Sequence, residues 1–212
     1  MHHSTRKRIV LAVTGASGMP YARTLANMLQ DLCELHLIVS KAGWLVWDQE
    51  MAEPREDLLG TAFCSYSQND LAAPPASGSW RHQGMVVCPC SMASLAAIAN
   101  GLGSNLIHRA ADVTLKERQR LVLVTRETPL NSIHLENMLS ITRAGGVVLP
   151  ASPGFYHRPQ TIQDIARQLC GRILDSLGME HELTPRWGDE LHDSPHPANQ
   201  TPFQGENSWN IA

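Results

Sequence analysis

The fold is decided by residues 9–18, which read Ile9-Val-Leu-Ala-Val-Thr-Gly-Ala-Ser-Gly18. The apolar run 9–13 predicts a buried strand, and the small residues 14–18 predict a tight turn. The next segment, 19–32, places apolar side chains at helical spacing: Leu25, Met28, Leu29 and Leu32. A strand, a turn and a helix in this order are typical of the first unit of a parallel β-α-β sheet.

The same alternation continues along the chain. Further strands are predicted at Leu35 to Val39, Met85 to Cys88, Leu121 to Thr125 and Val147 to Leu149, and further helices at Met92 to Asn100, Leu130 to Ala144 and Thr161 to Leu177. The strands lack polar alternation, as strands buried on both faces should. We therefore expect an α/β fold: a Rossmann-like or flavodoxin-like three-layer sandwich with a mostly parallel sheet and helices on both faces.

The domain organisation follows from where this pattern stops. Residues 1–187 are predicted to form a single domain. From Gly188 onward, prolines, amides and charges replace apolar periodicity, so residues 188–212 are predicted to be a poorly ordered tail.

Composition excludes several classes of protein. The chain has 212 residues, 43% of them hydrophobic and 17% charged, with a formal net charge of -3. These values exclude a disordered, a collagen-like or a strongly basic chain, and we expect no nucleic-acid partner. The five cysteines show no zinc-ligand spacing, so no metal is expected. No apolar run approaches the ~18 residues of a membrane span, and the N-terminal run is too short for a signal peptide, which favours the cytoplasm.

Small and polar residues follow four of the predicted strands: Thr14 to Gly18, Ser40, Pro89-Cys90-Ser91 and Arg126-Glu127-Thr128. Parallel sheets bind ligands at the carboxyl ends of their strands. The pair Gly15 and Gly18 is compatible with a phosphate-binding turn or simply with a tight turn that needs two glycines. It lacks the third glycine of the dinucleotide fingerprint, and none of the tyrosines has a lysine four positions later. A mononucleotide with one phosphate fits better.

A second constellation is basic. Arg109 to Asp112 leads to Lys116, Glu117 and Arg118, a charge run that is more typical of a solvated helix face than of a binding site. Arg126 and Glu127 are harder to assign to solvent, because they leave a strand where burial is expected. An arginine at this point can hold a phosphate, and a neighbouring carboxylate can transfer a proton.

Six segments together resemble the UbiX-like flavin prenyltransferases, within the flavin-binding decarboxylase-like flavoproteins. They are Thr-Gly-Ala-Ser-Gly at 14–18, Pro-Cys-Ser-Met at 89–92, Arg-Ala-Ala-Asp-Val-Thr-Leu-Lys-Glu at 109–117, Arg-Glu-Thr-Pro at 126–129, His-Leu-Glu-Asn-Met at 134–138 and Pro-Gly-Phe-Tyr at 153–156. The resemblance implies an enzyme that joins the prenyl group of dimethylallyl monophosphate to N5 and C6 of reduced FMN without a metal. It also implies a UbiD-type decarboxylase as recipient of the prenylated FMN, and a homododecamer.

The resemblance also implies roles for individual residues. The expected FMN contacts are Gly15, Ala16, Ser17, Ser40, Ser91, Met92, Ala93, Ser94 and Arg126. The expected prenyl-phosphate contacts, partly contributed by neighbouring subunits, are Lys116, Arg126, Glu127, Tyr156 and Arg172. Catalytic roles are implied for Ser17, Glu50, Lys116 and Glu127, with Glu50 beside the flavin.

One departure and two alternatives accompany this interpretation. Leu71 stands where some members of the family carry a tryptophan, at a position expected to wall the prenyl pocket, so the preferred prenyl length is open. An oxidative decarboxylase of cysteinyl substrates is a second hypothesis, but its Pro-x-Met-Asn-x-x-Met-Trp segment is missing. A flavin-binding carrier without catalysis is the third.

Overall fold

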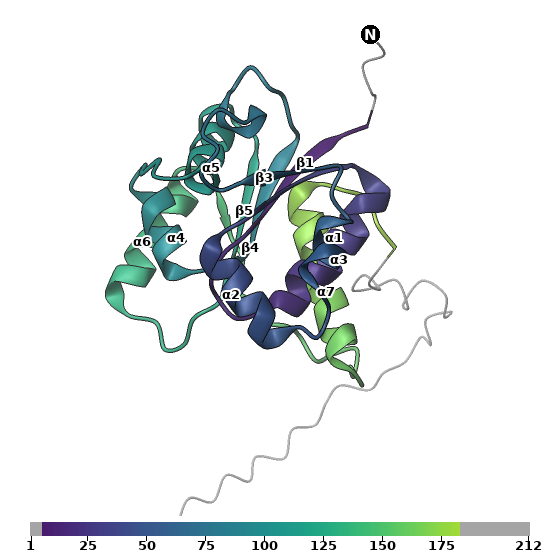
Figure 1. The fold of residues 1–212 in the computed structure, drawn as a ribbon. Coiled ribbons are helices and arrows are strands. Elements are labelled where there is room, and N and C mark those ends of the chain that lie inside the picture. The colour runs from purple at the N-terminus through teal and green to yellow at the C-terminus, as the bar shows by residue number, and fades with distance from the viewer. Residues whose placement is uncertain (1–5, 183–212) are drawn as a thin grey trace, which may run out of the picture.

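A computed structural model describes residues 6–182 of the chain. Those residues form one parallel sheet covered by helices on both faces (Figure 1). The last residues of the predicted domain, 183–187, and the predicted tail, 188–212, lie outside the described residues.

The sheet is entirely parallel and has six strands in the order β3-β2-β1-β4-β5-β6. The strands are β1 (Arg8–Val13), β2 (Glu34–Val39), β3 (Cys64–Ser67), β4 (Gly84–Cys90), β5 (Arg120–Thr125) and β6 (Val147–Val148). The order changes direction between β1 and β4, and open parallel sheets bind ligands at such a switch point. The predicted α/β class is therefore confirmed, and the sheet adds one strand, β3, that the sequence pattern did not indicate.

Two helical layers cover the sheet. On one face lie α1 (Met19–Leu32), α2 (Lys41–Glu50), α3 (Arg55–Leu59) and α7 (Ile162–Leu177), and on the other lie α4 (Met92–Ala99), α5 (Leu106–Lys116) and α6 (Ser132–Arg143), with the 3-10 turn η1 (Pro74–Ala76) beside α5 (Figure 1). The predicted helices correspond to α1, α4, α6 and α7. Helices α2, α3 and α5 are not among the helices predicted from the sequence.

The sheet divides the core into two parts. Ile9, Leu11 and Val13 of β1 pack toward α1 and α7, whereas Val10 and Ala12 pack toward α4 and α5. All five side chains are buried, so the strand carries apolar residues at successive positions instead of alternating with polar ones. Because β1 lies inside the sheet and is buried on both faces, the turn that follows it lies centrally along the edge formed by the carboxyl ends of the strands.

None of the described helices is long and apolar enough to cross a membrane. Among the same residues, no group of three or more His, Cys, Asp or Glu side chains is placed to hold a metal ion. All five cysteines are free thiols.

Candidate active site

The turn after β1 requires both of its glycines. A Cβ on Gly15 would lie 2.5 Å from the Cβ of Ala42, so only glycine permits this approach to the start of α2. Gly18 has a φ of 123°, a conformation that side chains disfavour, and it is the residue directly before α1. The two glycines therefore allow the backbone of this turn to approach the start of α2 closely and to enter α1 directly.

Three helices, α1, α2 and α4, begin at this edge of the sheet. Two of the predicted flavin contacts, Ser40 and Ser91, cap α2 and α4. The Ser40 hydroxyl accepts a hydrogen bond of 2.8 Å from the Gly43 N–H in α2. The Ser91 hydroxyl accepts one of 3.3 Å from the Ser94 N–H in α4. Helix N-termini carry a partial positive charge and unpaired N–H groups, which bind phosphate and other anions. Met92 and Ala93, also predicted contacts, form the first turn of α4.

Glu50 closes the N-terminus of the third helix, α1. Its Oε2 accepts hydrogen bonds of 2.8 Å from the N–H groups of both Gly18 and Met19. Partial burial opposes ionisation of Glu50, but the hydrogen bonds from Ser17, Gly18 and Met19, together with the charge of Arg126, outweigh it and lower the pKa of the carboxyl. The structure thus places Glu50 beside Ser17, and it leaves the N-termini of α2 and α4 to receive an anion.

Arg126 lies at the same edge, directly after β5. Its backbone N–H is 3.4 Å from the carbonyl oxygen of Cys90, which places it next to the Ser91 turn. Its side-chain Nε is buried and has no hydrogen-bond partner among the described residues. A buried guanidinium nitrogen without a partner is costly, so this orphaned donor indicates that a polar or anionic ligand belongs beside it. Arg126 and the serines fit the predicted flavin site.

Glu127 also occupies this edge, but it is exposed. Its Oε1 accepts a hydrogen bond of 3.1 Å from the Thr128 N–H. Thr125, the last residue of β5, is buried, and its hydroxyl likewise has no partner within the described chain. The end of β5 therefore combines a half-buried cation, whose Nε is buried, with an exposed carboxylate.

Lys116 lies at the opposite edge of the sheet, where the strands begin. It ends α5, four residues before Arg120, which starts β5 and pairs with Gly84 at the start of β4. A strand of this length spans about 20 Å. Within one chain, the structure does not bring Lys116 and Glu127 together.

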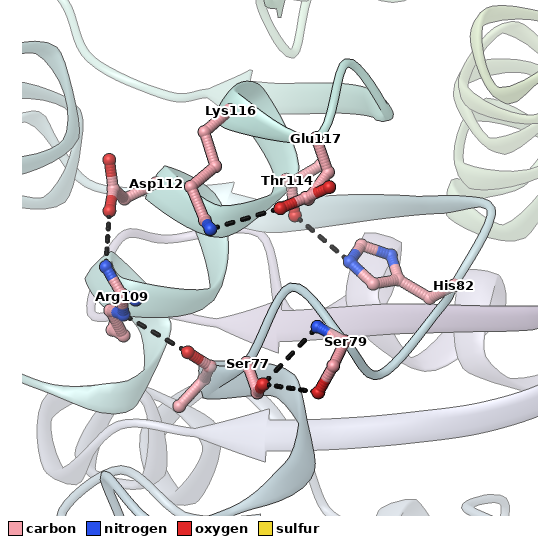
Figure 2. Close-up of polar contacts among 9 residues, drawn as sticks. Ser77, Ser79, His82, Arg109, Asp112, Thr114, Lys116 and Glu117 are labelled. Carbon is pink, nitrogen blue, oxygen red and sulfur yellow. Dashed lines mark hydrogen bonds and ion pairs between the residues drawn. The ribbon is translucent and has the colours of Figure 1, made fainter.

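Lys116 has a polar neighbourhood of its own (Figure 2). Its Nζ lies 3.1 Å from Glu117 Oε1, and a Cβ on Gly78 would lie 3.1 Å from the same Nζ. Arg109, seven residues earlier on α5, donates from Nε to the Ala76 carbonyl at 3.2 Å and pairs with Asp112 at 2.7 Å. The segment from Ala76 to Gly78 thus lies against Arg109 and Lys116, two cations on one face of α5. Arg109 is not among the predicted site residues, although its seven-residue spacing to Lys116 places both cations on one face of a helix.

The last two predicted phosphate contacts lie on the surface. Tyr156 is 83% exposed in the segment after β6. Arg172 projects from α7 and pairs with Asp175 at 2.8 Å. It lies five residues before Leu177, which packs against Gly84 where β4 begins, so Arg172 is not part of the edge that carries Arg126. A site that uses all five predicted residues requires more than one copy of the chain.

Comparisons with known proteins show the family to which the chain belongs. The family model described as Flavoprotein matches residues 1–174. The flavin prenyltransferase UbiX of Pseudomonas aeruginosa is 47% identical over 199 residues, which are 87% of this chain and 95% of the relative. The mitochondrial flavin prenyltransferase PAD1 of Saccharomyces cerevisiae is 49% identical over 182 residues, 85% of this chain and 75% of the relative.

Solved structures with high similarity have the same fold. The structure of AnUbiX in complex with FMN and dimethylallyl pyrophosphate has a TM-score of 0.83 and 45% identity, with coverage of 86% of this chain and 97% of that chain. A dodecameric FMN-dependent UbiX-like decarboxylase from Escherichia coli O157:H7 has a TM-score of 0.82 and 42% identity, with coverage of 85% and 98%. A PPC decarboxylase, at 18% identity and a TM-score of 0.56, shares the fold alone.

Proposed function

The chain belongs to the Flavoprotein family and, within it, to the flavin prenyltransferases, and on this premise we propose that it joins the dimethylallyl group of dimethylallyl monophosphate to reduced FMN. The new bonds form at N5 and C6 of the flavin, and inorganic phosphate leaves. The observation that carries the proposal is the buried Nε of Arg126, which has no hydrogen-bond partner within residues 6–182, at the edge where α2 and α4 begin.

The FMN site is proposed to consist of three groups of residues at that edge. Backbone groups of Gly15, Ala16 and Ser17 approach the flavin, since glycine at position 15 keeps the turn close to the start of α2. The N-termini of α2 and α4 supply N–H groups and capping hydroxyls for phosphate and ring oxygens: Ser40, Ser91, Met92, Ala93 and Ser94. Arg126 donates its Nε–H to the bound molecule, and FMN, when bound, supplies the nucleophilic ring atoms.

The prenyl-phosphate site is proposed to lie between copies of the chain. One copy supplies Arg126 and Glu127, and neighbouring copies supply Lys116, Tyr156 and Arg172. Arg109 and the Gly78 turn beside Lys116 add a further cation and backbone groups. The exposed apolar residues of α6, Ile133, Leu135 and Leu139, support an oligomer, because a monomer would leave them in water. We propose a dodecamer, the state named for the relative from Escherichia coli.

The proposed roles follow from charge and position. Loss of phosphate from an allylic carbon creates negative charge on the leaving oxygens and positive charge on carbon, so cations must face the phosphate and water must be excluded. Lys116, Arg126 and Arg172 stabilise the phosphate oxygens. Glu127, exposed beside Arg126, transfers a proton to the departing phosphate. Ser17 and the ionised Glu50 hold the flavin side of the site.

The destination of the product is part of the proposal. Prenylated FMN is expected to pass to a UbiD-type decarboxylase. We place the protein in the cytoplasm, supported by its five free thiols, which suit a reducing compartment.

An anaerobic assay tests the function. The full chain is incubated with dithionite-reduced FMN and dimethylallyl monophosphate, and the flavin is analysed by mass spectrometry. The expected product carries one added five-carbon prenyl group, and inorganic phosphate appears in equal amount. Recovery of unmodified FMN would contradict the proposal, and carbon dioxide release from a cysteinyl peptide would favour the decarboxylase alternative.

A further inference from the structure

Thr14 joins the two turns that carry most of the proposed FMN contacts. The residue directly follows β1 and is 1% exposed. Its hydroxyl donates a hydrogen bond of 2.8 Å to the Pro89 carbonyl and accepts one of 2.8 Å from the Ser91 N–H. Its backbone N–H also donates to the Pro89 carbonyl, at 3.2 Å. One buried side chain thus links segments 75 and 77 residues apart.

These bonds act where the sheet no longer aligns the two segments. The paired register between β1 and β4 ends at Ala12 and Val87. The register between β4 and β5 shifts between Val87 and Cys90. Beyond Val87, the position of the Ser91 turn relative to the turn after β1 therefore depends on the contacts of Thr14.

Both partners of Thr14 lead directly to the proposed FMN contacts. The Thr14 carbonyl accepts a hydrogen bond of 2.9 Å from the Ala16 N–H, which shapes the first turn. The Ser91 N–H, held by the Thr14 hydroxyl, belongs to the residue that caps α4. A change in the Thr14 hydroxyl would displace the α4 N-terminus relative to Gly15 and Ser17.

We propose that Thr14 is a positioning residue of the flavin site, which holds the turn after β1 and the N-terminus of α4 at the spacing that one FMN molecule spans. The inference rests on the proposed function for the identity of the ligand. Thr14 is buried behind the turns and acts through Ser91 and Ala16. A misplacement of about 1 Å at such contacts is enough to reduce binding and rate strongly.

Three substitutions test this role. Thr14→Val keeps the shape and removes the hydroxyl, whereas Thr14→Ser keeps the hydroxyl. Thr61→Val is the matched control, because Thr61 is also buried and donates its hydroxyl to a carbonyl, that of Leu58 at 2.7 Å, in the connection from α3 to β3. The measurements are the dissociation constant of FMN, the visible spectrum of the bound flavin, the thermal unfolding temperature and the yield of prenylated FMN.

We expect Thr14→Val to raise the dissociation constant of FMN at least about tenfold and to change the spectrum of the bound flavin, the effect of a lost buried hydrogen bond at a ligand site. Thr14→Ser should restore binding to within about threefold of the wild type. Thr61→Val should lose comparable thermal stability but keep its FMN affinity and spectrum. If Thr14→Val does not fold, Thr14→Cys, whose thiol is a weak hydrogen-bonding group, replaces it and should give an intermediate loss.

The outcomes separate this inference from the proposed function. FMN affinity in Thr14→Val equal to that in Thr61→Val, with normal prenylation by the wild type, would overturn the positioning role alone. A wild type that binds FMN without prenylating it, combined with weaker binding in Thr14→Val, would support the role of Thr14 and contradict the proposed reaction. Failure of Thr14→Ser to restore binding would also overturn the role.

Discussion

The carboxylate of Glu50, the last residue of α2, lies 2.8 Å from the backbone nitrogen of Gly18, the residue directly before α1. The last residue of α2 thus caps the start of α1, and the same carboxylate interacts with Arg126. The negative charge of Glu50 therefore acts both on the N-terminus of α1 and on the charge of the proposed flavin contact Arg126.

Glu50→Gln should weaken both effects, because an amide keeps an acceptor but carries no charge. We expect a loss of about 0.5–1 kcal/mol in the free energy of unfolding, the usual size of a charge effect at a helix N-terminus. Prenylation should also slow, because Arg126 loses its counter-charge. Chemical denaturation and the anaerobic assay measure the two effects. Asp48→Asn, which removes an exposed carboxylate from the same helix, should leave the rate unchanged.

The sign of the pH effect follows from the lowered pKa of Glu50. A carboxylate whose pKa is lowered by folding contributes stability above its unfolded pKa and loses that contribution as the pH falls through its folded pKa. The difference in unfolding free energy between wild type and Glu50→Gln should therefore be present at neutral pH and vanish in acid. A difference that persists unchanged to pH 2 would contradict the role of the charge.

Glu127→Gln should separate binding from chemistry. The exposed carboxylate is not required to complete the FMN site, so the dissociation constant of FMN should stay within about twofold. Loss of the proton transfer should slow formation of prenylated FMN by about 10²–10⁴-fold. Single-turnover kinetics with reduced FMN measure the rate. Glu56→Gln, an exposed change on α3, is the control, and an unchanged rate in Glu127→Gln would remove Glu127 from the mechanism.

The placement of Lys116 and Glu127 at opposite edges predicts complementation between subunits. Lys116→Ala and Glu127→Gln should each be nearly inactive when purified alone. Mixed oligomers, made by co-expression of the two variants in equal amounts, should regain about a quarter of wild-type activity, because that share of shared sites receives both native residues. Absence of any recovery in oligomers verified as mixed by native mass spectrometry would contradict a site that spans subunits.

His36 predicts loss of stability in mild acid. The residue is 4% exposed and hydrogen-bonds through Nδ1 to the Tyr66 hydroxyl at 2.9 Å. Burial and then the charge of Arg8, only partly offset by Glu34 and reinforced by His82, lower the pKa of His36 to about 4. A base with a lowered folded pKa stabilises the fold above its unfolded pKa of about 6.5 and loses that contribution as the pH falls toward the folded value.

The expected effect of His36 is a decrease of about 2 kcal/mol in the free energy of unfolding between pH 7 and pH 5. His36→Phe, which keeps a ring but cannot titrate, should show a shallower decrease. Part of the slope should remain, because burial also lowers the pKa of His82. Urea denaturation across this pH range checks the prediction, and equal slopes in both proteins would contradict it.

Local patterns in the sequence determined most of the sheet. The predicted strands 9–13, 35–39 and 121–125 agree closely with β1, β2 and β5, because strands buried on both faces leave uninterrupted apolar runs. The sequence pattern did not indicate β3, because β3 is a half-exposed edge strand whose sequence, Cys-Ser-Tyr-Ser, has no apolar run. α2 was missed because Gly43 weakens its helical signal, yet burial against Val13 and Val39 requires that glycine.

The candidate site, too, could be predicted from the sequence only in part. The sequence by itself determined which residues leave the carboxyl ends of the strands, since strand direction in a parallel sheet places all of those ends at one edge. Only the tertiary structure decided that Glu50 caps α1, that Thr14 holds Ser91, that no other described residue bonds the Arg126 Nε and that Lys116 lies at the far edge. Those facts depend on distances between segments far apart in the chain, and residue spacing along a helix or strand carries no information about such distances.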